Sequence, residues 1–213
     1  MGVPDWKQSE EVLFQKGKEA IFRFAEEHPD EVCSFFAIYS DFCYGDVAFM
    51  FDTLDNSLLE AKRHEGHLVK RWQDWFDDDS QHRDPRFFRP AWELAYTSFS
   101  SPLRGRKRID DYNAFGSFKY ESYLVVDFAD WRAYFESDEF MARVSSEDEP
   151  RKPDPFEGNV ILLIWKVIER LLHEGMFQKL TLSSPFRVGF QFHDAELVVL
   201  RILNWPPHKG PRV

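Results

Sequence analysis

Three side chains of one predicted helix have the types and the spacing to hold a metal ion. If residues 55–76 form a helix, Glu60, His64 and His67 fall within an arc of about 60°. One carboxylate and two imidazoles on one face are ligands for zinc and similar ions, which predicts a metal-dependent hydrolase. The same arc points about 130° away from the apolar stripe of the helix, where solvated residues belong. A solvated helix face is the preferred interpretation, and a metal site or a pH-sensitive contact is the alternative.

Two acidic runs are candidate surfaces for binding a basic partner protein. Consecutive carboxylates are poor metal ligands, because alternate spacing is what lets loop ligands converge on one ion. An acidic surface instead speeds the approach of a positively charged protein, and the chain has a formal net charge of −10. A plain solvated surface is the other interpretation of these runs. The six residues are Asp77, Asp78, Asp79, Glu147, Asp148 and Glu149.

Nucleic-acid binding is not expected. An acidic chain is repelled by phosphate backbones, so such binding would require a local basic patch. The dense basic cluster at residues 104–108 has no interleaved aromatic platform, and Asp110 and Asp111 follow it at once and cancel much of its field. We interpret this cluster as a solvated loop.

Three single residues are weaker candidates for chemistry. Glu65 projects into the apolar stripe of the predicted helix, where a buried carboxylate would need a partner and have a raised pKa. A shift of helical phase at Gly66 would instead place Glu65 in water. Cys43 has no base near it in sequence and is interpreted as a packed thiol. His193 lies beside Asp194, a carboxylate that could orient its ring. Both residues lie at a predicted turn, and an ordinary role in that turn explains them without catalysis.

The standard signatures of catalysis and cofactor binding are missing from the sequence. It contains no GxGxxG or GxxxxGK phosphate loop, no HExxH, no pair of CxxC motifs and no GxSxG elbow. The common nucleotide, flavin and zinc classes are therefore disfavoured, and no cofactor is predicted. A non-enzymatic role is favoured, although an enzyme can also assemble its residues from distant segments.

The sequence predicts a cytoplasmic protein without a membrane segment. Only two cysteines occur in 213 residues, which is too few for a disulfide framework. The N-terminal residues lack the apolar run and the cleavage site of a signal peptide. The longest apolar stretch, Val160–Ile168, is about half as long as a membrane-spanning helix.

The order of the predicted elements indicates an α+β fold. Helices and strands do not alternate as βαβ units, which favours a mixed or antiparallel sheet with helices packed on it. We predict a single domain over residues 1–213, with a linker-like loop near residues 146–157. The predicted helices are 9–27, 55–76, a short one from 129, and 159–174; the predicted strands are 34–40, 46–53, 92–96, 123–128, 185–192 and 196–203.

Aromatic residues are expected to dominate the interior. They make up 17% of the chain and include 22 Phe, so the core can be filled by few, large side chains. Successive side chains of the predicted strand 34–40 point to opposite faces of the sheet, and those on both faces are apolar. This pattern predicts a strand inside a sheet that is covered on both faces.

Three segments together resemble a known family. They are FAIYSDFCYGDVAFMFDT at 36–53, WELAYTSFSSP at 92–102 and LVVLRILN at 197–204. They resemble a bacterial family of uncharacterised domains of similar length, some of which are encoded among polymorphic toxin–immunity genes. The resemblance implies a bacterial cytosolic protein that neutralises a toxin by binding it, and it implies no catalytic residues. We therefore expect a non-enzymatic binding protein, with the metal-dependent hydrolase and a homo-oligomeric scaffold as alternatives.

Overall fold

The computed structural model describes residues 4–60, 118–138, 140–141, 155–193 and 197–203. Backbone contacts divide the chain into two compact units, Met1–Leu54 with Phe118–Val213, and Asp55–Ser117. Of the second unit, the described residues 55–60 are helical. The sheet and the long helices belong to the first unit, and a single domain over residues 1–213 stays a prediction.

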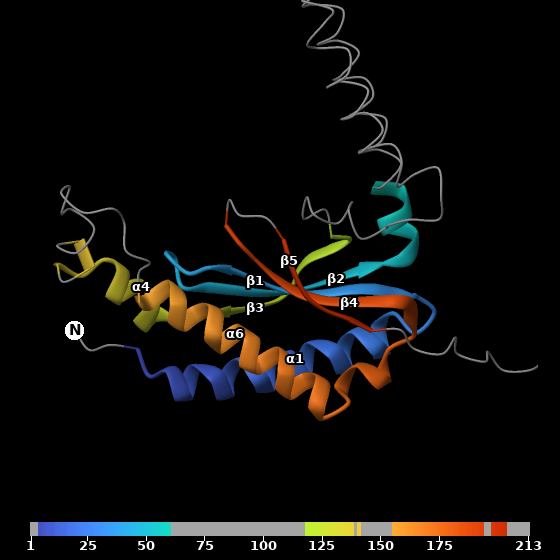
Figure 1. Cartoon of the computed structure of the whole chain (residues 1–213), viewed down its shortest axis with the longest axis horizontal. Helices are drawn as coiled ribbons and strands as arrows, with labels where there is room; N and C mark the ends of the chain where they lie inside the picture. Colours follow the sequence, from blue (N-terminus) through green and yellow to red (C-terminus); the bar gives the residue numbers. More distant parts are fainter. Residues whose placement is uncertain (1–3, 61–117, 139, 142–154, 194–196, 204–213) are drawn as a thin grey trace, which may run out of the picture. The chain divides into compact units, whose positions relative to one another are not determined.

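A five-stranded mixed sheet forms the centre of the first unit (Figure 1). Its strands lie in the order β3-β2-β1-β4-β5. β1 and β4 are parallel, whereas the other neighbouring pairs are antiparallel. The mixed sheet with its packed helices confirms the predicted α+β class. The strands are β1 (Cys33–Asp41), β2 (Asp46–Thr53), β3 (Tyr120–Asp127), β4 (Leu182–Phe192) and β5 (Val198–Leu203).

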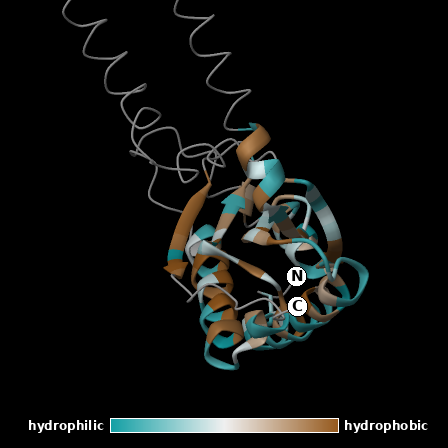
Figure 2. Ribbon diagram, turned by 90° about the vertical axis from the view of Figure 1, so that its right-hand side faces the viewer, coloured by the Kyte–Doolittle hydropathy of each residue, from teal (hydrophilic) through white to brown (hydrophobic). Residues whose placement is uncertain are grey.

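Two long helices lie together on one face of this sheet (Figure 1). In Figure 2 their ribbons alternate between hydrophobic and hydrophilic residues, as expected of helices with one buried side. The shorter helices follow β3 and the second long helix. The helices are α1 (Trp6–Glu27), α4 (Ala129–Phe135), α6 (Pro155–His173) and the 3₁₀ helix η3 (Met176–Lys179).

Both long helices begin earlier than the sequence pattern predicts. α1 starts at Trp6 because the Asp5 carboxylate accepts hydrogen bonds from two backbone N–H groups of the first turn, at 3.1 and 3.0 Å. α6 starts at Pro155, inside the predicted loop 146–157. Proline is well tolerated in a first helical turn, since its missing N–H would have no partner within the helix there. The end of that predicted linker is therefore helix.

The helix-facing side of the sheet meets α1 and α4 in an aromatic core. Phe24 of α1 stacks on Phe51 of β2, with ring centroids 4.3 Å apart. Trp131 of α4 is fully buried, stacks on Phe128 at 4.4 Å, and donates a hydrogen bond through Nε1 to Ser9 Oγ of α1 at 3.3 Å. The core of large rings that the composition predicts is confirmed in the described residues.

The other face of the sheet contains a buried pair of opposite charges. Phe35 of β1 lies opposite both Asp52 of β2 and Arg187 of β4. Residues opposite each other on neighbouring strands point to the same face, whereas the next residue, Phe36, joins the helix-side core. Burial lowers the pKa of Arg187 to about 10, against the opposing effect of the Asp52 charge. Arg187 is therefore cationic at neutral pH beside a buried carboxylate.

Among the described residues, no helix combines the length and the apolar character needed to cross a bilayer.

Candidate functional site

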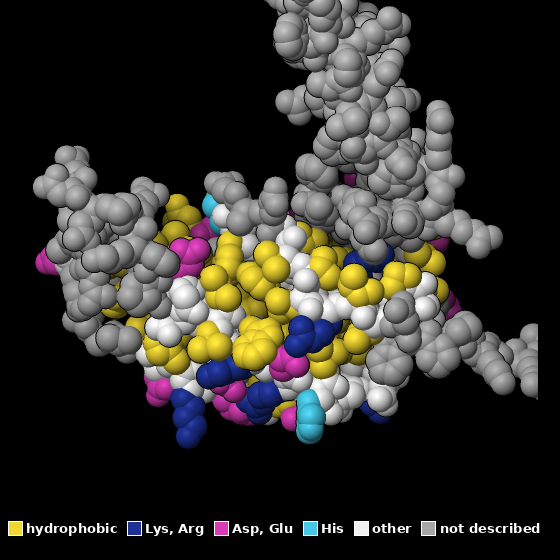
Figure 3. Space-filling view, in the orientation of Figure 1, with side chains coloured by type: hydrophobic (Ala, Val, Ile, Leu, Met, Phe, Trp, Pro, Cys, Tyr) yellow, Lys and Arg dark blue, Asp and Glu magenta, His cyan; other side chains and the backbone are white. Residues whose placement is uncertain are grey.

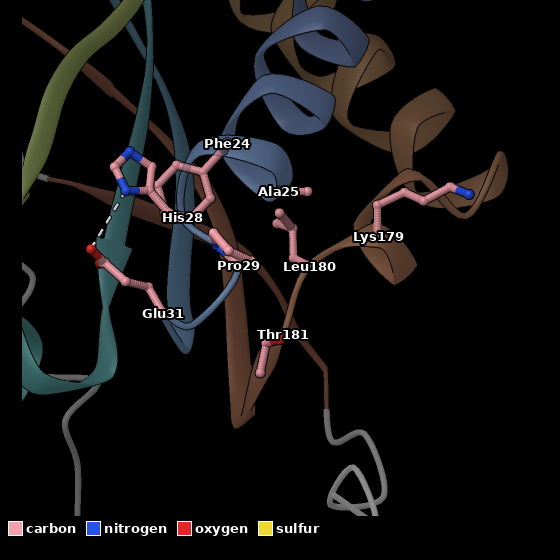
Figure 4. A pocket seen from close by; sticks show the side chains of 8 residues that line it. All are labelled: Phe24, Ala25, His28, Pro29, Glu31, Lys179, Leu180 and Thr181. Atoms are coloured by element: carbon pink, nitrogen blue, oxygen red, sulfur yellow. Dashed lines mark ion pairs between the residues drawn. The ribbon is translucent and has the colours of Figure 1, made fainter. Parts of the chain in front are cut away.

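A small pocket lies where α1 ends, beside the segment that follows η3 (Figure 4). Its volume is about 150 Å³, below the roughly 300–1,000 Å³ of ordinary small-molecule sites. Such a volume accommodates only a very small ligand. The lining residues are Phe24, Ala25, His28, Pro29, Glu31, Lys179, Leu180 and Thr181.

Two titratable residues of this pocket, His28 and Glu31, contact Lys119 and Tyr120 at the start of β3. Tyr120 donates from its hydroxyl to Glu31 Oε1 at 2.6 Å, and the same hydroxyl lies 3.2 Å from His28 Nδ1. Lys119 Nζ donates to both oxygens of Glu31 at 2.9 Å. His28 Nδ1 lies 3.6 Å from Glu31 Oε1, as the dashed line in Figure 4 marks. Glu31 is thus the acceptor that ties the end of α1 to the start of β3.

The pKa shifts at Glu31 and its neighbours are unfavourable for acid–base catalysis. Partial burial opposes ionisation of Glu31, but the hydrogen bonds from Tyr120 and Lys119 outweigh it and lower its pKa. The bond to Glu31 raises the pKa of Lys119, and burial followed by that same carboxylate raises the pKa of Tyr120. A general acid or base works best with a pKa near neutrality, and all three groups shift away from it. We interpret this cluster as a structural brace.

Removing the Tyr120 hydroxyl should weaken this brace in a pH-dependent way. The folded pKa of Glu31 lies below its ordinary value of 4.5, so ionised Glu31 stabilises the fold above that pH, and the stabilisation is lost as the pH falls through the folded pKa. We expect Tyr120→Phe to lower the free energy of unfolding by about 1–2 kcal/mol at pH 7, with the difference shrinking below pH about 4. Urea unfolding at several pH values measures this.

Tyr123→Phe is the matched control for that prediction. Tyr123 donates an equally short bond, 2.6 Å, but its acceptor Glu27 is exposed. The control should therefore cost less than Tyr120→Phe. A larger loss in Tyr123→Phe, or a Tyr120→Phe effect that does not depend on pH, would contradict the assignment.

The turn between β1 and β2 presents a second group of side chains, which we call the hairpin end and define as residues 41–46. Tyr44 at its tip is 63% exposed, the largest value among the exposed large hydrophobic side chains of the described residues. Gly45 has φ of +78°, and a Cβ there would collide with the backbone oxygen of Phe128. Arg132 of α4 donates to the backbone oxygen of Tyr44 at 2.9 Å and to Asp127 at 2.8 Å. The backbone that carries Tyr44 is thus held on two sides.

Phe42 anchors the hairpin end to the interior. Its ring lies 5.5 Å from that of Phe192, 5.7 Å from Phe135 and 6.2 Å from Phe156, measured between centroids. These three rings belong to β4, α4 and α6. A turn fixed in this way presents Tyr44 without a large loss of conformational entropy on binding.

Carboxylates lie around the same turn. Asp41 Oδ2 lies 3.5 Å from Nδ1 of His193, whose ring nitrogen also lies 2.8 Å from the Tyr39 hydroxyl. Cys43 is half-buried, and its pKa is raised by burial first and then by the charges of Asp41 and Glu157. A raised pKa keeps Cys43 as a thiol, which disfavours the nucleophile interpretation, as the sequence analysis expects. His193 does have a carboxylate near its ring, that of Asp41 at the end of β1, whereas Asp194 lies outside the described residues.

No family model, curated protein or solved structure matches this chain. The resemblance to the toxin–immunity-associated family therefore stays a prediction.

Most side chains that the sequence singles out lie outside the described residues. Glu60 is half-buried in the helical residues 54–60, but His64 and His67 are not described, so the metal site is untested. In the part of the chain that is described, no group of three or more His, Cys, Asp or Glu side chains is placed to hold a metal ion. The other candidates outside the described residues are Glu65, residues 104–108, Asp77, Asp78, Asp79, Glu147, Asp148 and Glu149.

Tyr44 is the side chain that the sequence analysis missed. The available signal was its position next to Gly45 in a turn between two apolar strands. A large ring at the tip of a hairpin lies too far from the strands to join the core that they form. An aromatic residue in such a turn is therefore a candidate for contact with another molecule.

Proposed function

We propose that the protein is a non-enzymatic binding protein that captures a basic partner protein at the hairpin end. The observation that carries this is Tyr44, an exposed ring on a turn whose backbone is held by Phe128 and Arg132. Tyrosine is among the residues that supply most binding energy in protein interfaces, because it offers a large, rigid contact area. A fixed turn also lowers the entropic cost of binding.

The charge around Tyr44 supports a basic partner. Asp41 and Asp46 flank the turn, and Asp130 and Glu157 are exposed acidic residues of α4 and α6. Glu157 and Asp41 both act on the Cys43 thiol through their charge, which places them near the turn. Carboxylates at the rim of an aromatic anchor speed the approach of a positively charged protein and select against acidic ones. The formal net charge of −10 acts in the same direction.

Two further points are consistent with this proposal. The Glu31 cluster has pKa shifts that disfavour catalysis, so the described pocket supports a structural role. The family resemblance adds a class of partner, a bacterial toxin domain that the protein would neutralise in the cytoplasm by occluding its active site.

A pull-down with the full chain tests the proposal. Wild-type protein should recover one stoichiometric basic protein from the native host, and higher salt should weaken the complex. Tyr44→Ala should weaken binding about 30-fold or more, as expected of a central aromatic anchor. Phe22→Ala is the matched control, because Phe22 is also an exposed aromatic residue but lies on α1. Recovery of no stoichiometric partner, or equal binding by Tyr44→Ala, would refute it.

A further inference from the structure

Strand β5 forms an edge of the sheet and carries apolar side chains on both of its faces. In the described residues its strand partner is β4 alone, on one side. Val198 lies opposite Phe190 of the helix-side core and therefore faces the helices. Val199 and Ile202 face the other side of the sheet, because their partners on β4 are Gly189 and Arg187. All three valine and isoleucine side chains are exposed. An exposed apolar edge of this kind is a template for pairing with another strand.

The two edges of the sheet differ in charge. β3, at the other edge, carries the exposed acidic residue Glu121, and also Asp127, which is paired with Arg132. Charged side chains are a usual device that keeps an edge strand from pairing with a neighbour. β5 has one charged residue, Arg201, and its guanidinium lies 2.6 Å from the carboxylate of Glu169 on α6. β5 therefore has no counterpart to Glu121, the acidic side chain that guards the β3 edge.

Helix α6 extends the apolar surface beside β5. Ile161, Leu162 and Trp165 are exposed, and Trp165 lies four residues after Ile161 and three after Leu162, which places it beside both on the helix surface. Arg170, on another side of α6, contacts Glu11 of α1, so the apolar row is separate from the α1 contact. Figure 3 shows hydrophobic side chains gathered in the centre of the face that carries α6 and β5.

We propose that this surface binds a second copy of the chain, with β5 paired antiparallel to β5 of the partner about a two-fold axis. Such a pairing continues the sheet from one copy into the other and places α6 of both copies on the same side of it. The apolar rows of the two helices then face each other beside the strand seam. A lone extended peptide would cover the β5 edge but would leave Ile161, Leu162 and Trp165 in water, so a second copy fits better.

The size and the charge of the surface are consistent with a dimer. The six apolar side chains border the β5 edge on both faces of the sheet and together expose on the order of 500 Å² in each copy, similar to the largest apolar patches of single proteins, which are often functional. A stable dimer buries about 800 Å² per copy, and the paired strand backbone with its polar rim supplies the remainder. The Arg201–Glu169 pair is neutral within each copy, so two copies meet there without like-charge repulsion.

Sedimentation equilibrium of the full chain tests this proposal. We expect wild-type protein at about 100 μM to sediment as twice the chain mass of 25.3 kDa. Ile202→Lys should raise the dimer dissociation constant about 100-fold or more, because the two-fold axis brings two unpaired charges into the seam. Val125→Lys is the matched control: Val125 and Ile202 are both 52% exposed, but Val125 lies on β3.

Each outcome decides for or against the dimer. A dimer that Ile202→Lys dissociates and Val125→Lys leaves intact supports it, with unchanged far-UV circular dichroism showing that both variants fold. A wild-type monomer at about 100 μM, or equal behaviour of the two variants, overturns it. Tyr44→Ala should remain dimeric, so a failure of the dimer and a failure of the proposed partner site are distinguishable.

Discussion

Replacing Arg187 by Met should lower the free energy of unfolding by about 3–5 kcal/mol. Asp52 is completely buried and Arg187 is 1% exposed, so removal of the guanidinium leaves a carboxylate in the interior without that compensating charge. The carboxylate keeps its hydrogen bond from the backbone N–H of Lys119, at 3.2 Å, but a neutral donor does not replace a positive charge. Urea unfolding followed by circular dichroism measures the loss.

The double variant Arg187→Met with Asp52→Asn separates the charge from the packing. Asparagine keeps an oxygen that can accept from Lys119 and removes the buried negative charge. We expect the double variant to recover part of the stability, because loss of both charges is cheaper than loss of one. If the two single losses simply add, or if Arg187→Met costs less than about 1 kcal/mol, the charge pair does not have the role assigned here.

Replacing Trp131 by Ala should be comparably damaging, at about 3–5 kcal/mol. Its ring is fully buried, stacks on Phe128 and lies 5.8 Å from Trp6 and 6.0 Å from Phe156. Trp6 and Phe156 come from distant parts of the chain, so the contacts of Trp131 join α4 to the helix-side core from several sides. The cavity that alanine would leave is therefore expected to stay open. Guanidinium unfolding followed by far-UV circular dichroism measures the effect, because the ellipticity of the backbone does not depend on Trp131 fluorescence.

Trp131→Phe is the graded control for that prediction. Phenylalanine retains a ring against Phe128 but loses the hydrogen bond from Nε1 to Ser9 Oγ. We expect a loss of about 1–2 kcal/mol, well below that of Ala. Equal losses for Phe and Ala would show that the hydrogen bond, and not ring packing, is the main contribution.

The hairpin end depends on the same core. Phe156, which lies near Trp131, also contacts Phe42, and Phe42 anchors the turn that carries Tyr44. A variant that loosens the core at Trp131 is therefore expected to weaken partner binding as well as stability. Tyr44→Ala, by contrast, removes an exposed side chain and should leave the free energy of unfolding nearly unchanged.

Local sequence patterns predicted much of the secondary structure. The β1–β2 hairpin, the short helix after β3, the long helix α6 and the β4–β5 pair all lie where the alternation of apolar residues places them. The boundaries differ where a local cap or a proline sets them, as at Asp5 and Pro155. Local patterns suffice here because an amphipathic helix or strand shows its buried face within a few residues.

The candidate site was harder to predict. Charge runs such as 77–79 and 147–149 stand out in a sequence, but they lie outside the described residues. The hairpin end is inconspicuous, because it needs Phe128, which follows β3, and Arg132 of α4 to hold the turn. His193 lies 3.5 Å from Asp41, a carboxylate far from it in sequence that local patterns do not predict.

By itself, the sequence determined the α+β class, an interior rich in aromatic rings and an acidic overall charge, since these depend on composition and short-range periodicity. Only the tertiary structure decided that β1 pairs in parallel with β4, and thereby that Asp52 and Arg187 flank Phe35. It also decided that β5, not β3, is the apolar edge. The physical reason is that pairing between distant segments depends on how whole faces fit together, and a short window of residues contains no information on its distant neighbour.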